Sequence, residues 1–194
     1  MSLDPKHLGD VLEGIQLVGR ATDTEERAEL IAAGMQARID AVVERVSQAT
    51  ARPRVLSLEW IDPQICGSHW IPEMVDLASG FNCFGDKETR SFGLDWADVV
   101  DSRPEVVILM PCGFDVKRAL KDVPLLAQKD GWSSMPAVLE KRVYIIDASA
   151  YTSRSGPRLV TGLEIMAEMI HLELFSGTAP DAGWLRLDED LLRA

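Results

Sequence analysis

Three apolar, β-rich runs, each followed by an unusual loop and then by a helical pattern, constrain the fold of this chain most. The runs cover residues 54–58, 106–110 and 143–146. Continuous apolar strands are typical of a parallel sheet buried on both faces, and strands that alternate with helices indicate βαβ units. We therefore predict an α/β fold, a Rossmann-like parallel β-sheet lobe flanked by helices.

The loops that follow these strands carry residues suited to binding a small molecule. They cover residues 59–70, 111–115 and 150–157. The carboxyl ends of parallel strands share one edge of the sheet, and ligands bind at that edge in open α/β folds. Aromatic walls with a few polar groups are typical of a small-molecule cleft. The large side chains expected to converge there are Trp60, Trp70, Phe114, Tyr151 and Arg154.

Two helices are predicted ahead of the first strand. Asp4 and Pro5 resemble an N-cap and a first helical position, and an apolar stripe follows at helical spacing. A second apolar stripe predicts one continuous helix from Thr22 to Ala49, roughly 40 Å long at 1.5 Å per residue. Its expected inward residues are Ala28, Ile31, Met35, Ile39, Val42 and Val46. A helix of this length suggests a strut.

Three segments follow from these patterns. Residues 1–50 are expected to form a helical hairpin with the strut helix, residues 51–176 an α/β substrate-binding lobe, and residues 177–194 an irregular tail. Shorter elements are predicted within the lobe. These are helices over 72–79, 95–101, 116–128, 133–140 and 159–175, and a strand over 81–84.

The charge and cysteine content exclude several functions. A net charge of −11, from 31 acidic and 20 basic residues, argues against nucleic acid or anionic lipid as a main partner, because phosphate binding needs a basic surface. The three cysteines are odd in number and lack the spacing of a metal knuckle or redox pair, so we expect reduced thiols. The chain has no G-x-G-x-x-G, P-loop or G-x-S-x-G motif.

Individual candidates have structural alternatives. Trp60 and Trp70 either cover the edge of the core or pack against a flat ligand. Cys66 and His69 lie three residues apart and could ligate a metal, although one such pair is a weak signal and a surface role for His69 is favoured. Cys112 is interpreted as a pocket-lining residue, because no nearby acid or histidine in the sequence would activate it.

From residue 54 onward the sequence resembles a known family. The segments that carry the resemblance are residues 54–60, 70–80, 103–111 and 131–147. They resemble the C-terminal lobe of class III substrate-binding proteins, which serve ABC transporters for cobalamin, haem and ferric siderophores. The loop Pro111–Phe114 and the segment Tyr151–Arg158 are most similar to the cobalamin-binding sub-family.

The resemblance spans residues 4–175 and implies two lobes joined by a rigid helix, with ligand held between them. The strut would be that helix, and the N-terminal lobe of the family would be absent, which suggests a truncated chain. The implied ligand is cobalamin or a related corrinoid, with haem or a ferric siderophore as alternatives, and no covalent cofactor. The implied ligand-binding residues are Trp60, Trp70, Cys112, Gly113, Phe114, Tyr151 and Arg154.

The resemblance also implies partners. It gives Glu73 the role of docking onto arginines of an ABC permease, and we expect this side chain to be exposed and to make no essential fold contact. The half-cleft is expected to leave apolar surface exposed and to promote self-association. The location would be periplasmic or the cell envelope if the gene encodes an export signal; this chain shows no signal-peptide pattern, so a cytoplasmic location is the alternative.

The competing hypothesis is an enzyme. Parallel α/β edges also occur in metal chelatases and nitrogenase-like proteins, and Cys66, His69 and Cys112 would then be metal ligands. The resemblance favours the non-enzymatic interpretation, in which the lobe captures a metal chelate for delivery to an importer.

Overall fold

The computed structural model describes residues 3–86, 90–180 and 182–190. Its centre is a six-stranded sheet in the order β2-β1-β4-β5-β6, with β3 paired to the start of β1. The strands β3, β1, β4 and β5 run parallel, whereas β2 and β6 are antiparallel additions. The strands are β1 (Arg54–Trp60), β2 (Ile65–Cys66), β3 (Phe81–Asn82), β4 (Val106–Leu109), β5 (Val143–Ile146) and β6 (Trp184–Arg186).

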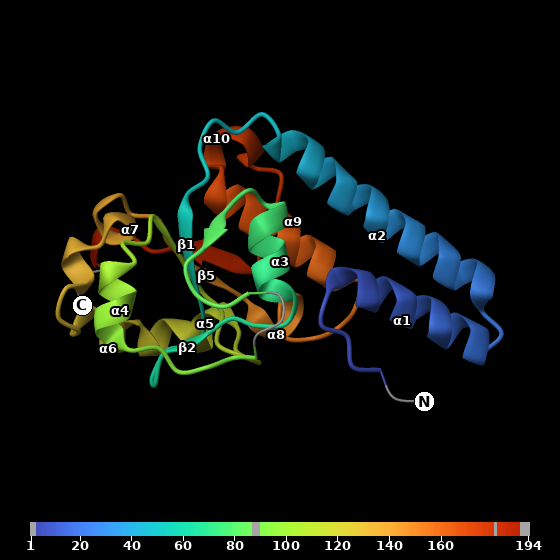
Figure 1. Cartoon of the computed structure of the whole chain (residues 1–194), viewed down its shortest axis with the longest axis horizontal. Helices are drawn as coiled ribbons and strands as arrows, with labels where there is room; N and C mark the ends of the chain where they lie inside the picture. Colours follow the sequence, from blue (N-terminus) through green and yellow to red (C-terminus); the bar gives the residue numbers. More distant parts are fainter. Residues whose placement is uncertain (1–2, 87–89, 181, 191–194) are drawn as a thin grey trace.

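Helices surround this sheet (Figure 1). They are α1 (Leu8–Ala21), α2 (Glu25–Val46), α3 (Trp70–Leu77), α4 (Trp96–Asp101), α5 (Val116–Ala119), α6 (Val123–Ala127), α7 (Pro136–Leu139), α8 (Ala148–Tyr151), α9 (Arg158–Ile170) and α10 (Leu172–Phe175). Within the described residues, none of these helices combines the length and the apolar character that crossing a membrane requires.

Alternate side chains of the central strands enter two separate cores. Val106 and Ile108 of β4 belong to the core that also contains buried residues of α2, α3 and α9. Val107 and Leu109 belong to the second core, with buried residues of α4 to α7. A strand covered on both faces must be apolar at every position, which explains the continuous runs in the sequence. The predicted fold class is therefore confirmed.

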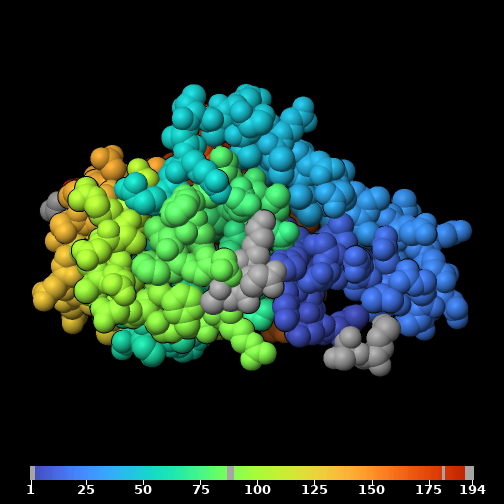
Figure 2. Space-filling view, viewed as in Figure 1, coloured from blue at the N-terminus to red at the C-terminus, as the bar shows by residue number. Residues whose placement is uncertain are grey.

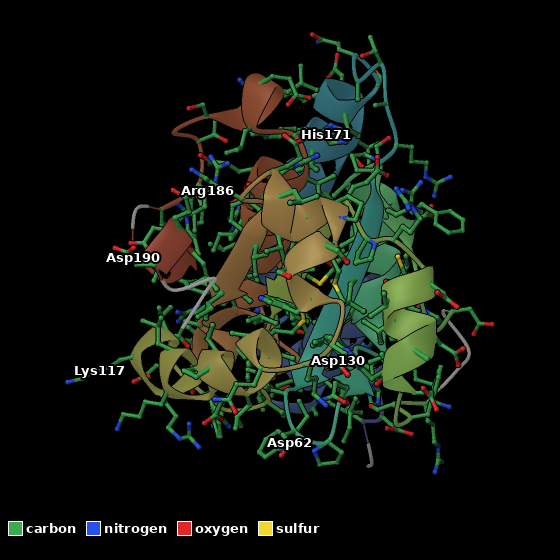
Figure 3. The ribbon with its side chains drawn as sticks, turned by 90° about the vertical axis from the view of Figure 1, so that its left-hand side faces the viewer. Asp62, Lys117, Asp130, His171, Arg186 and Asp190 are labelled. Atoms are coloured by element: carbon green, nitrogen blue, oxygen red, sulfur yellow. The ribbon has the colours of Figure 1, made fainter. Side chains whose placement is uncertain are left out.

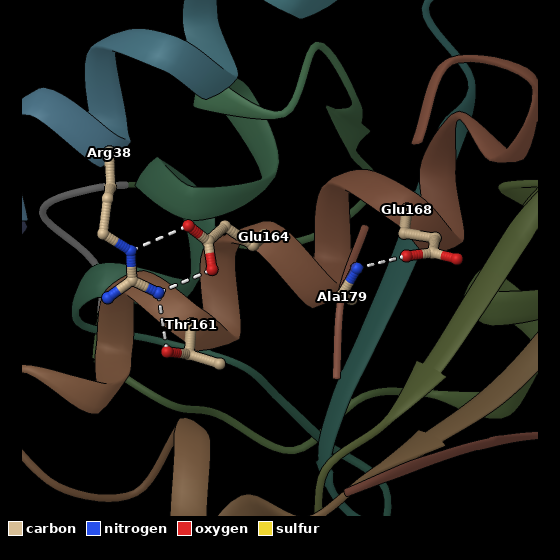
Figure 4. A network of polar contacts seen from close by, with 5 residues as sticks. All are labelled: Arg38, Thr161, Glu164, Glu168 and Ala179. Atoms are coloured by element: carbon tan, nitrogen blue, oxygen red, sulfur yellow. Dashed lines mark hydrogen bonds and ion pairs between the residues drawn. The ribbon is translucent and has the colours of Figure 1, made fainter. Parts of the chain in front are cut away.

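The α1–α2 hairpin extends from one end of the lobe (Figures 1 and 2). The predicted strut is one continuous helix, α2, and its buried stripe includes Met35, Ile39 and Val42. Arg38 ties α2 to α9: its Nε and Nη2 donate to the two carboxylate oxygens of Glu164 at 2.8 and 2.6 Å, and Nη2 also donates to Thr161 Oγ1 at 2.8 Å (Figure 4).

Several helix boundaries differ from their predicted places. The N-cap of α1 is His7 rather than Asp4, because Asp10 Oδ2 accepts from the backbone N–H of Lys6 and of His7 at 2.8 and 3.0 Å. The helix predicted over 116–128 is divided into α5, a 3-10 turn at Leu120–Asp122 and α6. The helix predicted over 159–175 is interrupted at His171, whose φ of −134° is not helical.

The tail, which we expected to be irregular, adds a strand to the sheet. β6 pairs antiparallel with β5 and places Leu185 opposite Ile145. The buried carboxylate of Glu168 in α9 holds the loop before β6, because it accepts from the backbone N–H of Gly177 and of Ala179, both at 2.7 Å. Figure 4 shows the bond to Ala179. Residues 181 and 191–194 of the tail lie outside the described residues.

Candidate functional site

The three loops singled out in the sequence meet at one edge of the sheet. β1, β4 and β5 are parallel neighbours, so their carboxyl ends share that edge. Figure 3 shows Asp62, which follows β1, and Lys117, in α5 after β4, at this end of the lobe, whereas His171 lies at the opposite end. The predicted convergence of the loops is therefore confirmed.

A pocket of about 330 Å³ lies at this edge. Its walls come from the ends of β1 and β4, the entry to α3, the loop between α8 and α9, and residues 3–7 ahead of α1, here called the leading segment. Residues that line it include Asp4, Glu59, His69, Trp70, Cys112 and Ser153. Two of these are carboxylates, and none of the described lining residues is a lysine or arginine.

Trp70 and Cys112 are the predicted site residues that line the pocket. The indole Nε1 of Trp70 donates to the backbone oxygen of Thr152 at 2.9 Å, which fixes the ring against the loop after β5. The backbone N–H of Cys112 donates to the backbone oxygen of Glu59 at 3.0 Å, which continues the pairing with β1 beyond the end of β4. The thiol side chain of Cys112 is exposed.

Trp60, Phe114 and Gly113 lie at the same edge without lining the pocket. The Trp60 and Phe114 rings pack at a tilt of 55° with centroids 5.2 Å apart, and the Arg118 guanidinium lies 4.3 Å from the Phe114 centroid. Gly113 adopts a φ of +77°, which favours glycine, and its N–H donates to Ser153 Oγ at 3.0 Å. This bond joins the loops after β4 and β5 and so shapes the pocket indirectly.

Tyr151 and Arg154 do not line the pocket either. The Tyr151 ring lies so close to the tail that a side chain at Gly183 would overlap it, and Arg154 is exposed. Trp60, Trp70, Phe114 and Tyr151 are all half-buried rather than fully exposed. Each ring therefore leaves part of its surface to solvent, and self-association through this edge stays a prediction.

His69 lines the pocket in an unusual backbone conformation. Its φ of +53° is uncommon for a residue with a side chain, and such strain often occurs at binding sites. The ring Nδ1 lies 2.7 Å from Ser68 Oγ, which is also 2.7 Å from Ser91 Oγ. The two serines therefore orient the imidazole.

The cysteines are not arranged as a metal site. All three are free. Burial raises the pKa of the Cys66 thiol and raises that of Cys83 to about 11, so both are held as unreactive thiols. In the part of the chain that the structure describes, no group of three or more His, Cys, Asp or Glu side chains could hold a metal ion.

The expectation that Glu73 is exposed and free of fold contacts is wrong. The side chain is half-buried, and its Oε2 accepts the backbone N–H of Leu8 at 2.7 Å. Leu8 is the first residue of α1, so Glu73 satisfies one of the N–H groups that a helix start leaves without an internal partner. From the sequence alone, Glu73 could be recognised only as an acidic residue placed favourably in the first turn of a helix.

Some lining residues were not predicted as site residues. Glu59 lies near the end of β1, and Met110 immediately follows β4. The rule that ligands bind at the carboxyl ends of parallel strands could therefore have identified both. Asp4 and Pro5 also line the pocket, and the helix that follows them contacts α3 through Leu8 and Glu73, which are 65 residues apart in the sequence. No local pattern indicates such a contact.

Comparison with known proteins identifies the family. The model of the periplasmic binding protein family matches residues 2–150. The chain belongs to the periplasmic binding protein family. This finding confirms the resemblance seen in the sequence, and the family is one of binding proteins rather than enzymes.

A curated relative and two solved structures are similar to this chain. The chain is 26% identical over 178 residues to YvrC of Bacillus subtilis, an uncharacterized ABC transporter substrate-binding lipoprotein, and the match covers 89% of the chain and 53% of YvrC. The chain thus spans about half the length of this relative. S. aureus IsdE complexed with heme (14% identity, TM-score 0.76, 87% of this chain and 67% of IsdE) shares the fold. The vitamin B12 binding protein BtuF of Vibrio cholerae also shares the fold (18% identity, TM-score 0.72, 89% of this chain and 64% of BtuF).

Proposed function

We propose that this chain is the C-terminal lobe of a substrate-binding protein that captures cobalamin or a related corrinoid and delivers it to an ABC importer. The pocket at the carboxyl edge of the sheet is the proposed contact surface. Its volume of about 330 Å³ is at the lower end of the range for small-molecule sites. A corrinoid is larger, so this lobe would hold one side of it, and a second lobe would cover the other side.

The charge of the pocket favours a corrinoid over haem. Asp4 and Glu59 are hydrogen-bond acceptors, and the described lining contains serine hydroxyls but no lysine or arginine. The corrin ring carries peripheral amides, which donate hydrogen bonds to such groups. Haem carries propionate carboxylates, which are best bound by arginine. The absence of lysine and arginine among the described lining residues is the observation that carries this assignment.

The metal-enzyme alternative has less support. It required Cys66, His69 and Cys112 to act as ligands. Cys66 is buried at the edge strand β2, whereas Cys112 is exposed in the pocket, and the Nδ1 of His69 contacts Ser68. A binding role uses Trp70 and the pocket polar groups directly and requires no metal ligands from the chain.

The partners and location follow from the same proposal. An ABC permease would receive the ligand, and YvrC is a lipoprotein, so we infer a location at the cell envelope. The docking role of Glu73 remains a prediction for the complete protein. Self-association through the edge of the lobe also remains a prediction.

A titration of the whole chain with cyanocobalamin, and separately with haemin, tests the ligand. We expect saturable quenching of tryptophan fluorescence by cyanocobalamin, confirmed by calorimetry, and weaker binding of haemin. Replacing Trp70 by alanine should weaken cyanocobalamin binding about tenfold, because the ring contributes on the order of 1.5 kcal/mol through its burial and stacking. Circular dichroism checks that the variant is folded.

Trp96 provides a matched control. Like Trp70 it is half-buried and donates its indole N–H to a backbone oxygen, that of Asp130 at 2.7 Å, but it packs in the core on the other face of the sheet. Trp96→Ala should leave the affinity unchanged. Equal losses in the two variants, or tighter binding of haemin than of cyanocobalamin, would contradict the assignment.

A further inference from the structure

The leading segment forms a thin wall between two hollows. Asp4 and Pro5 line the pocket at the edge of the sheet. The same two residues line a second hollow of about 420 Å³ that follows α1, and Figure 2 shows a hollow beside this part of the chain. A segment with open space on both sides gains little from packing, so hydrogen bonds near its end must contribute much of its positioning.

Carboxylates hold the turn that connects the leading segment to α1. Asp10 Oδ2 accepts the N–H groups of Lys6 and His7, and these bonds stay within the α1 end of the chain. Glu73 Oε2 accepts the N–H of the next residue, Leu8, at 2.7 Å and joins this turn to α3. Leu8 is 2% exposed and lies in the same core as Ile71 and Met74 of α3.

α3 therefore contributes to the pocket in two ways. Trp70 at its first position lines the pocket, and Glu73, three residues later, binds the turn that places Asp4 and Pro5 opposite. Residues three apart lie on one face of a helix, so the wall residue and the anchor share a rigid support.

We propose that Glu73 is a positioning residue of the ligand pocket: its hydrogen bond to the Leu8 N–H holds the leading segment in place as one wall. The proposal rests on the proposed function for the identity of the ligand, but the position of the wall can be measured without any ligand. It is separate from docking, because no permease is needed to observe it. A hydrogen bond to a charged group is strong enough that its loss should change ligand affinity about tenfold.

The test compares Glu73→Ala, Glu73→Gln and Asp76→Ala with the unmodified chain. The amide side chain of Glu73→Gln retains an acceptor oxygen of the same reach. Asp76 is the control, since it is an exposed carboxylate on the same helix that pairs with Arg52 instead. Three quantities are measured: amide hydrogen exchange of Leu8, the alkylation rate of Cys112 by a maleimide, and the Kd for cyanocobalamin.

In Glu73→Ala we expect Leu8 exchange and Cys112 alkylation to accelerate and the Kd to rise about tenfold, because the wall loosens. In Glu73→Gln the exchange rate, the alkylation rate and the Kd should lie close to those of the unmodified chain. In Asp76→Ala all three should equal those of the unmodified chain. Faster Leu8 exchange with unchanged Cys112 alkylation would overturn the proposal, because the contact would then support only the helix. Unchanged Leu8 exchange would also overturn it. If the unmodified chain fails to bind cyanocobalamin, the proposed function falls, while exchange and alkylation still decide the role of Glu73.

Discussion

Met35→Asp is expected to destabilise the protein by about 3–5 kcal/mol, because it places a carboxylate in an apolar core. Met35 is 3% exposed and lies in the core formed by α2, α3 and α9. The aspartate would either lose its hydration or force α2 away from α9, and both outcomes lower the free energy of unfolding. Urea denaturation followed by circular dichroism measures the change.

Ala37→Asp is the control for Met35→Asp. Ala37 lies on the exposed face of the same helix, two residues away, so the same new charge should cost only a few tenths of a kcal/mol there. If the two variants unfold at the same urea concentration, the packing of α2 onto the lobe is wrong.

Gly162→Ala should destabilise the protein by about 1–3 kcal/mol, although alanine is the better helix former by about 1 kcal/mol. Gly162 lies within α9, and a Cβ atom there would be 2.4 Å from the backbone oxygen of Tyr151. That oxygen belongs to the main chain and cannot swing aside as a side chain could. Either α9 or the end of α8 must move, and the residues directly after α8, Thr152 and Ser153, line the pocket.

Gly34→Ala is the matched comparison for Gly162→Ala. Gly34 lies within α2, and no atom is found within 4 Å of a Cβ built there. This substitution should therefore stabilise the protein by about 0.5–1 kcal/mol. Opposite signs for the two glycines in thermal or chemical denaturation are the expected result, whereas stabilisation by both would show that α9 does not press on Tyr151 at the end of α8.

The central strands and the strut could be predicted from the sequence because burial leaves a local pattern. β5 is observed at the predicted residues, 143–146, and α2 is shorter than the predicted strut by a few residues at each end. β6 was missed because the tail forms a strand only by pairing with β5, which is distant in the sequence. Strand pairing of this kind depends on tertiary contacts, which no short stretch of the sequence contains.

The site residues likewise fall into those that a local pattern indicates and those that depend on a distant contact. The strand-end rule located the loops and correctly placed Trp70 and Cys112 in the pocket. Tyr151 does not line this pocket, because its ring occupies the space that Gly183, in the tail, provides, and its role in ligand binding stays a prediction. Glu73 was misjudged because its partner, the Leu8 N–H, belongs to a different segment of the chain. Residues whose role depends on one distant contact were therefore those that the sequence could not assign.

Protection of Cys112 by cyanocobalamin tests most directly whether the pocket at the carboxyl edge holds the ligand. Cys112 is the exposed thiol of the pocket, whereas Cys66 is buried and Cys83 has a pKa raised to about 11 by desolvation, so a maleimide should react first at Cys112. At a ligand concentration ten times the Kd, mass action predicts about tenfold slower alkylation if the bound ligand covers the thiol. An unchanged alkylation rate, at a concentration that saturates the fluorescence titration, would contradict binding at this edge.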